Sequence, residues 1–288
     1  MSIGQRQMSP RFPMKFAPHL GILRPDRPLF INHAGPDPID QLRFIADQGF
    51  AAVEDNNLQS RPVQVQDQMG AEMARLGIQM GCFVAFARET RPTFVSNDPA
   101  VREHIIKQIG IALEIAGRVS GRWITTVCGY PDPELPWAYQ FANVVDNLRF
   151  CAEQAQAAGV TLLVESTNRR ATPGVFITSI KDAYLAVRAA ASPAVKLVFD
   201  VGHVQVEDGD LIKNLDRCWD EIAYFQLADN PGRREPGSGE INFVNLLRRV
   251  HRKGYRGILD MEHLVSGEGR AGEEAVIRAY EALSAAIE

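Results

Sequence analysis

The sequence predicts an α/β fold, a single-domain (β/α)8 TIM barrel, on three observations. Eight short apolar runs alternate along the chain with stretches of helical periodicity. Most of these runs are continuously apolar, which is typical of parallel strands that are buried on both faces. The length of 288 residues also suits a barrel of eight strand–helix units, which averages roughly 250 residues.

Each apolar run is a predicted barrel strand. The runs cover residues 16–22, 50–54, 78–86, 123–129, 160–166, 195–201, 222–229 and 257–262. No change in composition along the chain marks a second domain. We therefore expect residues 1–13 to form an N-terminal extension and residues 14–288 to form the barrel.

Helical patterns fill the spaces between the runs. The clearest covers residues 98–117, where Asp98 suits the N-cap, Pro99 suits the first turn and apolar residues recur on one face. Other helices are predicted at residues 137–158, 240–253 and 272–287.

One of the predicted connections between strand and helix is long. Residues 23–37 follow the first predicted strand, and we expect them to cover part of the barrel mouth.

An open doubly wound sheet is the rival fold. Neither GxGxxG nor GxxxxGK[ST] follows the first run, so the phosphate-binding loop that often accompanies that fold is missing.

The composition excludes several function classes. Lys and Arg number 31 against 35 Asp and Glu, and this net charge of −4 does not suggest a nucleic-acid partner. No apolar run is long enough to span a membrane, and residues 1–13 contain no secretory signal. The four cysteines (Cys82, Cys128, Cys151 and Cys218) form no CxxC pair, so we expect buried thiols and a cytoplasmic location.

Polar residues end four consecutive predicted strands. These residues are Glu165, Asp200, Gln226 and Glu262, at spacings of 35, 26 and 36 residues, each about one strand–helix unit. The carboxyl ends of barrel strands meet at one face, so the four side chains should converge. Three unpaired carboxylates in one place are costly, and a divalent cation would relieve their repulsion. Oxygen donors favour Mg²⁺ or Mn²⁺, although separate salt bridges to Lys or Arg are the alternative.

Five further residues are candidate substrate contacts. His203 and Asn168 each lie three residues after a proposed metal ligand, while Arg233 and Glu240 belong to the Gly- and Pro-rich segment after the seventh strand. Glu54 ends the second strand. The alternatives are a structural histidine and a solvated charged loop.

Three segments carry a resemblance to a known family. VESTNRRATPG, FDVGHVQ and FQLADNPGRREPGSGEIN, followed by Glu262, resemble the xylose isomerase-like barrel superfamily and, within it, the hydroxypyruvate isomerase family. The resemblance implies one Mg²⁺ or Mn²⁺ ion and two catalytic glutamates, which are Glu165 and Glu262 here. Asp200 and Gln226 would complete the metal shell. The chain departs from the family at Tyr224, where a histidine is usual, and in HLVSG after Glu262.

The resemblance also implies a reaction. We expect a metal-dependent isomerase or epimerase that acts on a small hydroxycarbonyl acid or sugar through an enediolate, in a homo-oligomer such as a dimer or tetramer. A metal-dependent dehydratase of a keto-polyol or dehydroshikimate-like acid, and a non-catalytic sugar-binding barrel, are the alternatives. A DNA-repair endonuclease on this fold would use three zinc ions and many histidine ligands. The chain has only six histidines and no surplus of basic residues, so its composition does not support this function.

Overall fold

A computed structural model describes residues 11–85 and 89–287. All paired strands run parallel, as the apolar runs predicted. The strands are β1 (Lys15–Pro18), β2 (Ala52–Val53), β3 (Gln79–Met80), β4 (Cys82–Val84), β5 (Trp123–Thr126), β6 (Thr161–Val164), β7 (Val195–Asp200), β8 (Ile222–Gln226) and β9 (Ile258–Met261).

The strands close into a barrel. Seven of them hydrogen-bond in the order β1-β9-β8-β7-β6-β5-β4, and β2 pairs with β3. β3 and β4 are two parts of one barrel strand, separated only by Gly81. A parallel bridge between His19 and Glu54 joins β1 to β2 and completes the ring. The eight predicted strands are therefore confirmed as a TIM barrel.

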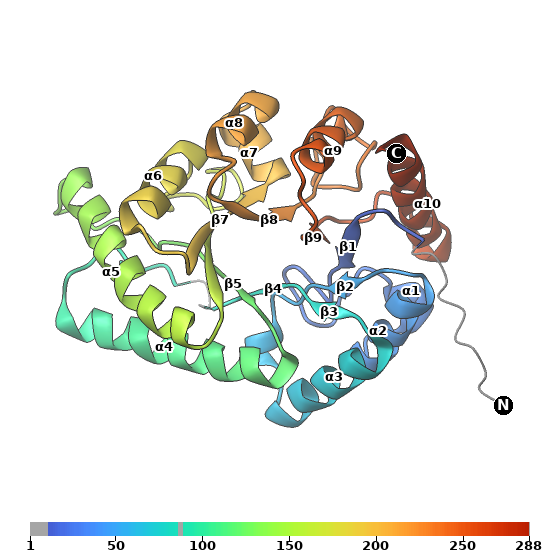
Figure 1. Cartoon of the computed structure of the whole chain (residues 1–288), viewed down its shortest axis with the longest axis horizontal. Coiled ribbons are helices and arrows are strands. Elements are labelled where there is room, and N and C mark those ends of the chain that lie inside the picture. Colours follow the sequence, from blue (N-terminus) through green and yellow to red (C-terminus); the bar gives the residue numbers. More distant parts are fainter. Residues whose placement is uncertain (1–10, 86–88, 288) are drawn as a thin grey trace.

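Helices surround the strands on the outside (Figure 1). They are α1 (Ile31–Ala34), α2 (Pro38–Asp47), α3 (Val63–Leu76), α4 (Pro99–Val119), α5 (Trp137–Ala157), α6 (Ile180–Ala190), α7 (Val201–Glu207), α8 (Leu211–Cys218), α9 (Phe243–Arg252) and α10 (Gly269–Ile287), with a 3₁₀ turn η1 (Leu58–Ser60). In the described part of the chain, no helix is both long and apolar enough to cross a bilayer.

The helix boundaries follow the capping signals in the sequence. Asp98 accepts a hydrogen bond from Ala100 N (2.8 Å) at the start of α4, and Pro99 occupies the first turn, as predicted. α9 begins three residues later than expected, because Asn242 caps it by accepting from Asn245 N (3.0 Å). The connection at 23–37 is not free of structure, since it contains α1.

Part of the predicted N-terminal extension falls within the described residues. Phe12 is buried, and its ring stacks on Phe50 with centroids 4.8 Å apart. Phe12 therefore packs against the start of the second predicted strand. Residues 1–10 of that extension, and Phe86 at the end of the third run, lie outside the described residues.

Two apolar cores hold the fold together. The larger fills the space between the sheet and the helices. The smaller lies inside the barrel, where residues from different strands meet: Ala17, Ala52, Cys82, Leu163, Val198, Tyr224 and Ile258. Tyr224 is the largest of these side chains, and Gly81 makes room for it. A Cβ at position 81 would lie 2.5 Å from the Tyr224 hydroxyl and 2.9 Å from Val53 O.

Candidate active site

The four residues predicted to bind metal lie at the carboxyl ends of four adjacent strands. Glu165 directly follows β6, Asp200 ends β7, Gln226 ends β8 and Glu262 directly follows β9. Asp200 and Gln226 are also register partners across β7 and β8. All four side chains are buried, with exposed fractions between 1% and 8%. The structure thus brings together the residues that the strand spacing placed at one face.

Arg233 supplies positive charge to two of these carboxylates. Its Nη2 lies 2.8 Å from Asp200 Oδ2 and 3.1 Å from Glu262 Oε2. Burial opposes ionisation of Asp200, but the attraction of Arg233, and then of His203, outweighs it and lowers the pKa of Asp200. The same two carboxylates raise the pKa of Arg233 despite its burial, so this guanidinium stays charged.

His203 connects the remaining glutamate to this group. Its Nε2 lies 3.6 Å from Glu165 Oε1 and 3.9 Å from Asp200 Oδ2. Its backbone N–H donates to Asp200 Oδ1 (2.7 Å), and Asn168 Nδ2 donates to its ring Nδ1 (2.6 Å). Because Nδ1 accepts, the proton of the neutral ring sits on Nε2, which faces the carboxylates. We call these six residues the mouth cluster: Glu165, Asp200, Gln226, Glu262, His203 and Arg233.

The carboxyl group of Glu262 is a weaker acid than an ordinary glutamate. Burial raises the pKa of its carboxyl to about 7, although Arg233 acts in the opposite direction. Its Oε1 accepts a hydrogen bond from Asn56 Nδ2 (3.0 Å), which comes from the connection after β2. A carboxyl with a pKa near neutrality is suited to both accepting and donating a proton.

The amino group of the Gln226 side chain contacts two residues from other strands of the barrel. Its Nε2 donates to Glu54 Oε1 (3.3 Å) and lies 3.8 Å from Cys82 Sγ. Its Oε1 is buried and has no hydrogen-bond partner among the described residues. Glu54, a predicted substrate contact, is fully buried, and its carboxyl group contacts the side chains of Cys82 and Gln226.

A second polar group lies deeper in the barrel, and we call it the inner cluster: Glu54, Cys82, Tyr224 and Asp260. The Tyr224 hydroxyl donates to Asp260 Oδ1 (2.6 Å) and accepts from Cys82 N (3.0 Å). Cys82 Sγ lies 3.2 Å from Asp260 Oδ2. Burial, together with mutual repulsion, raises the pKa of Glu54 well above its usual value, and burial does the same to Asp260.

The loop after β8 carries Arg233 into the site, and Asp229 organises it. The buried Asp229 carboxylate accepts from the backbone N–H groups of Gly237 (2.9 Å), Gly239 (2.9 Å) and Ile241 (3.1 Å). Arg233 itself adopts a positive φ of 50°. Leu264 N donates to Arg233 O (2.8 Å), which attaches the loop to the segment after Glu262.

Glu240, another predicted substrate contact, lies at the far end of this loop. Its side chain is exposed and accepts from Asn230 Nδ2 (2.8 Å) and Gln205 Nε2 (3.1 Å). These bonds join the loop to α7, and they do not include the mouth cluster. The structure therefore does not bring Glu240 to the other candidate residues.

Several residues of the site escaped the sequence reasoning. Asp260 was missed, although it is an acidic residue inside an apolar run and stands two positions before Glu262. Side chains two apart in a strand share one face, so this spacing was a usable signal. Asn56 and Asp229 belong to loops, whose folding no short pattern predicts.

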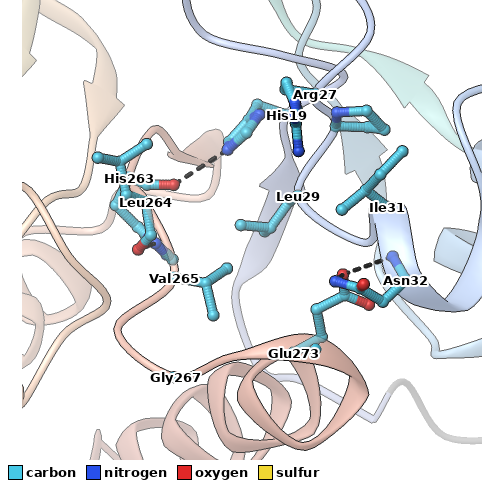
Figure 2. Close-up of a pocket in the computed structure, with 12 residues that line it drawn as sticks. His19, Arg27, Leu29, Ile31, Asn32, His263, Leu264, Val265, Gly267 and Glu273 are labelled. Carbon is cyan, nitrogen blue, oxygen red and sulfur yellow. Dashed lines mark hydrogen bonds between the residues drawn. The ribbon is translucent and has the colours of Figure 1, made fainter.

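A pocket of about 140 Å³ opens beside the mouth cluster, between the segments that follow β1 and β9. Figure 2 shows His19 and His263 on one side of it and Glu273 on the other. His19 Nε2 donates to His263 O (3.0 Å), and Glu273 accepts from Asn32 N (2.7 Å) and from His33 Nδ1 (2.6 Å). These groups bond to one another, so they fix the two segments around the pocket.

The donor set of the mouth cluster fits a divalent cation. Ligand atoms of Glu165, Asp200 and His203 lie within 4.8 Å of one another. Arg233 lies close to both Glu262 and Asp200, and Gln226 adds a buried carbonyl oxygen that has no hydrogen-bond partner within residues 11–85 and 89–287. Carboxylate and amide oxygens are the donors that Mg²⁺ and Mn²⁺ prefer.

The chain is similar to known proteins in sequence. The sequence model of the xylose isomerase-like TIM barrel family matches residues 42–285. A 2-oxo-tetronate isomerase of Cupriavidus necator is 34% identical over 58% of this chain and 63% of its own length. Hydroxypyruvate isomerase of Escherichia coli is 27% identical over 60% of this chain and 67% of its own length.

A solved structure shows the same fold. The crystal structure of a family 2 AP endonuclease from Brucella melitensis superimposes with a TM-score of 0.76 at 24% identity, and the match covers 90% of this chain and 96% of that one.

Proposed function

The chain belongs to the xylose isomerase-like TIM barrel family, and we propose that it is a divalent-metal-dependent isomerase of a small hydroxycarbonyl acid. One observation carries the proposal. Asp200 Oδ2 lies 2.8 Å from Arg233 and 3.9 Å from His203, and these two side chains reach Glu262 and Glu165 respectively. The two glutamates therefore face one shared space from strands that are not adjacent.

This space has the groups that proton transfer between neighbouring carbons requires. One glutamate removes a proton from the carbon beside the substrate carbonyl, which gives an enediolate. The same or the opposite glutamate returns the proton to the neighbouring carbon, while the hydroxyl proton moves to the oxygen of the former carbonyl. Glu262, with its pKa near 7, is our choice for the residue that changes protonation state most easily.

Glu165, Asp200, Gln226 and Glu262 would hold the metal. A bound Mg²⁺ or Mn²⁺ would supply a Lewis acid that stabilises negative charge on the substrate oxygens. Arg233 provides a fixed charge and paired N–H donors for an acidic substrate. His203, oriented by Asn168, offers its Nε2–H to a substrate oxygen.

The substrate class is supported by the names of the relatives. Hydroxypyruvate and 2-oxo-tetronate are both acids with a carbonyl beside a hydroxyl-bearing carbon. Because the match to the 2-oxo-tetronate isomerase spans only 63% of that enzyme, we extend to this chain the class of acid rather than one compound.

A substrate screen tests the proposal. Purified protein with added Mn²⁺ would be assayed with hydroxypyruvate, 2-oxo-tetronate and ketohexoses, with mass spectrometry of the products. We expect isomer formation at unchanged mass, and product lighter by one water would identify a dehydratase instead.

Two variants test the proton-transfer roles. Glu165→Gln and Glu262→Gln should each lower kcat by about 10³-fold, because each loses a group that exchanges the proton. Glu114→Gln, on the exposed face of α4, is the matched control and should keep full activity. Near-wild-type turnover in both site variants would refute the mechanism.

A further inference from the structure

The amide of Gln226 has two chemically different ends, and only one of them can bind a cation. The carbonyl Oε1 is a metal ligand, whereas the Nε2 amino group is a donor that repels one. A glutamine at a metal site therefore needs something that determines which end faces the ion. Aspartate and glutamate ligands have no such requirement, since their two oxygens are equivalent.

The inner cluster lies on the Nε2 side of this amide. Nε2 donates to Glu54 Oε1 at 3.3 Å and lies 3.8 Å from Cys82 Sγ. The amide is planar, so contacts on the Nε2 side turn Oε1 away from Glu54. Oε1 is the buried end without a hydrogen-bond partner among the described residues. The free end of Gln226 is thus the one that binds metals.

We infer that Glu54 is a positioning residue, which fixes the Gln226 amide with its carbonyl oxygen turned toward the metal ligands. This inference rests on the proposed metal site and goes beyond it, because it assigns Glu54 a task in metal binding rather than in substrate contact. Partners of metal ligands usually act in this way, and losing one typically weakens metal affinity by about 10–100-fold.

The inner cluster keeps Glu54 in place for this task. Cys82 Sγ lies 3.9 Å from Glu54 Oε1 and 3.2 Å from Asp260 Oδ2, so the thiol is shared between the two carboxyl groups. Tyr224 in turn bonds Asp260 and the backbone of Cys82. The packed and hydrogen-bonded side chains of the inner cluster therefore restrict the movement of the Glu54 acceptor oxygen.

Mn²⁺ binding to the purified, EDTA-treated protein tests the inference. The dissociation constant would be measured by calorimetry for the wild type, Glu54→Met and Glu54→Gln. Methionine keeps the volume but offers no strong acceptor, so the affinity should fall at least 10-fold. Glutamine keeps an acceptor oxygen, so Glu54→Gln should stay within about threefold of the wild type.

A control separates positioning from general damage to the fold. Asp55→Asn loses a buried ion pair with Arg61 (2.5 Å) in the same segment, and the side-chain hydrogen bonds of Asp55 within the described residues go to Arg61 and Asn57 rather than to Gln226. Its Mn²⁺ affinity should stay within about threefold of the wild type, while its melting temperature falls. If Glu54→Met does not fold, Glu54→Leu takes its place.

The outcomes distinguish this inference from the proposed function. A folded Glu54→Met protein that binds Mn²⁺ within twofold of the wild type would overturn the positioning role. So would an Asp55→Asn protein that loses as much affinity as Glu54→Met. A wild type that binds Mn²⁺ but isomerises no acid would refute the proposed activity and leave the comparison of Glu54 variants valid.

Discussion

The mouth cluster and the inner cluster contain the same kinds of acidic side chain, yet the pKa values of their aspartates shift in opposite directions. At the mouth, Arg233 lies 2.8 Å from Asp200 and 3.1 Å from Glu262. In the inner cluster Asp260 is hydrogen-bonded to the Tyr224 hydroxyl, the Cys82 thiol and Glu54. The pKa of Asp200 is therefore lowered, whereas burial raises the pKa of Asp260.

This difference shows how one barrel can hold charge at one level and exclude it at the next. Burial penalises the charged form at both levels, and the nearby Arg233 reverses the result for Asp200 but only opposes it for Glu262. Within the mouth cluster the pKa of Asp200 is lowered, whereas burial still raises the pKa of Glu262 to about 7. Burial raises the pKa of Glu54 and of Asp260 in the inner cluster, so these two carboxyl groups hold their protons more strongly than Asp200 does.

Removing Arg233 should have the largest effect. After EDTA treatment, Arg233→Ala should lower the free energy of unfolding at pH 7 by about 3 kcal/mol, because Asp200 and Glu262 lose their shared cation. Saturating Mn²⁺ should restore most of this loss, which urea unfolding with and without the metal would measure. Arg234→Ala, in the same loop, is the control, and Mn²⁺ should not repair its loss. If Mn²⁺ restores nothing in Arg233→Ala, the arginine acts through loop packing alone.

A pair of aspartate substitutions should sharpen the comparison further. Asp200→Asn should weaken Mn²⁺ binding at least about 10-fold, because a charged ligand becomes neutral. Asp260→Asn should change the Mn²⁺ dissociation constant by no more than about threefold, because burial raises the pKa of this carboxyl and it holds its proton more strongly than Asp200 does. Calorimetric titration of both variants measures this. Equal losses would mean that the inner cluster also carries charge.

The smallest effect concerns packing of the inner cluster. Gly81→Ala should cost about 1–3 kcal/mol of stability, since the new methyl group would meet the Tyr224 hydroxyl and Val53 O. Tyr224→Phe in the same protein should recover part of this loss. Gly110→Ala in α4 is the control, because nothing lies within 4 Å of a Cβ there. Chemical denaturation of the three variants and the wild type decides the point, and an unchanged Gly81→Ala protein would contradict it.

The sequence by itself determined the barrel and the location of the mouth cluster. Apolar runs of strand length, alternating with helical patterns, leave few architectures, and parallel strands bring their carboxyl ends to one face. Glu165, Asp200, Gln226 and Glu262 could be found because each ends such a run. Their metal-binding and catalytic roles stay predictions until the variants are measured.

Only the tertiary structure decided which carboxyl groups lie next to a cation and which are hydrogen-bonded to neutral groups. Arg233 reaches Asp200 because Asp229 folds the loop between β8 and α9, and this folding depends on backbone bonds to Gly237, Gly239 and Ile241. Glu54 meets Gln226 across 172 positions of sequence because the barrel closes. Contacts of this kind depend on closure and on loop shape, and no local period in a sequence encodes them.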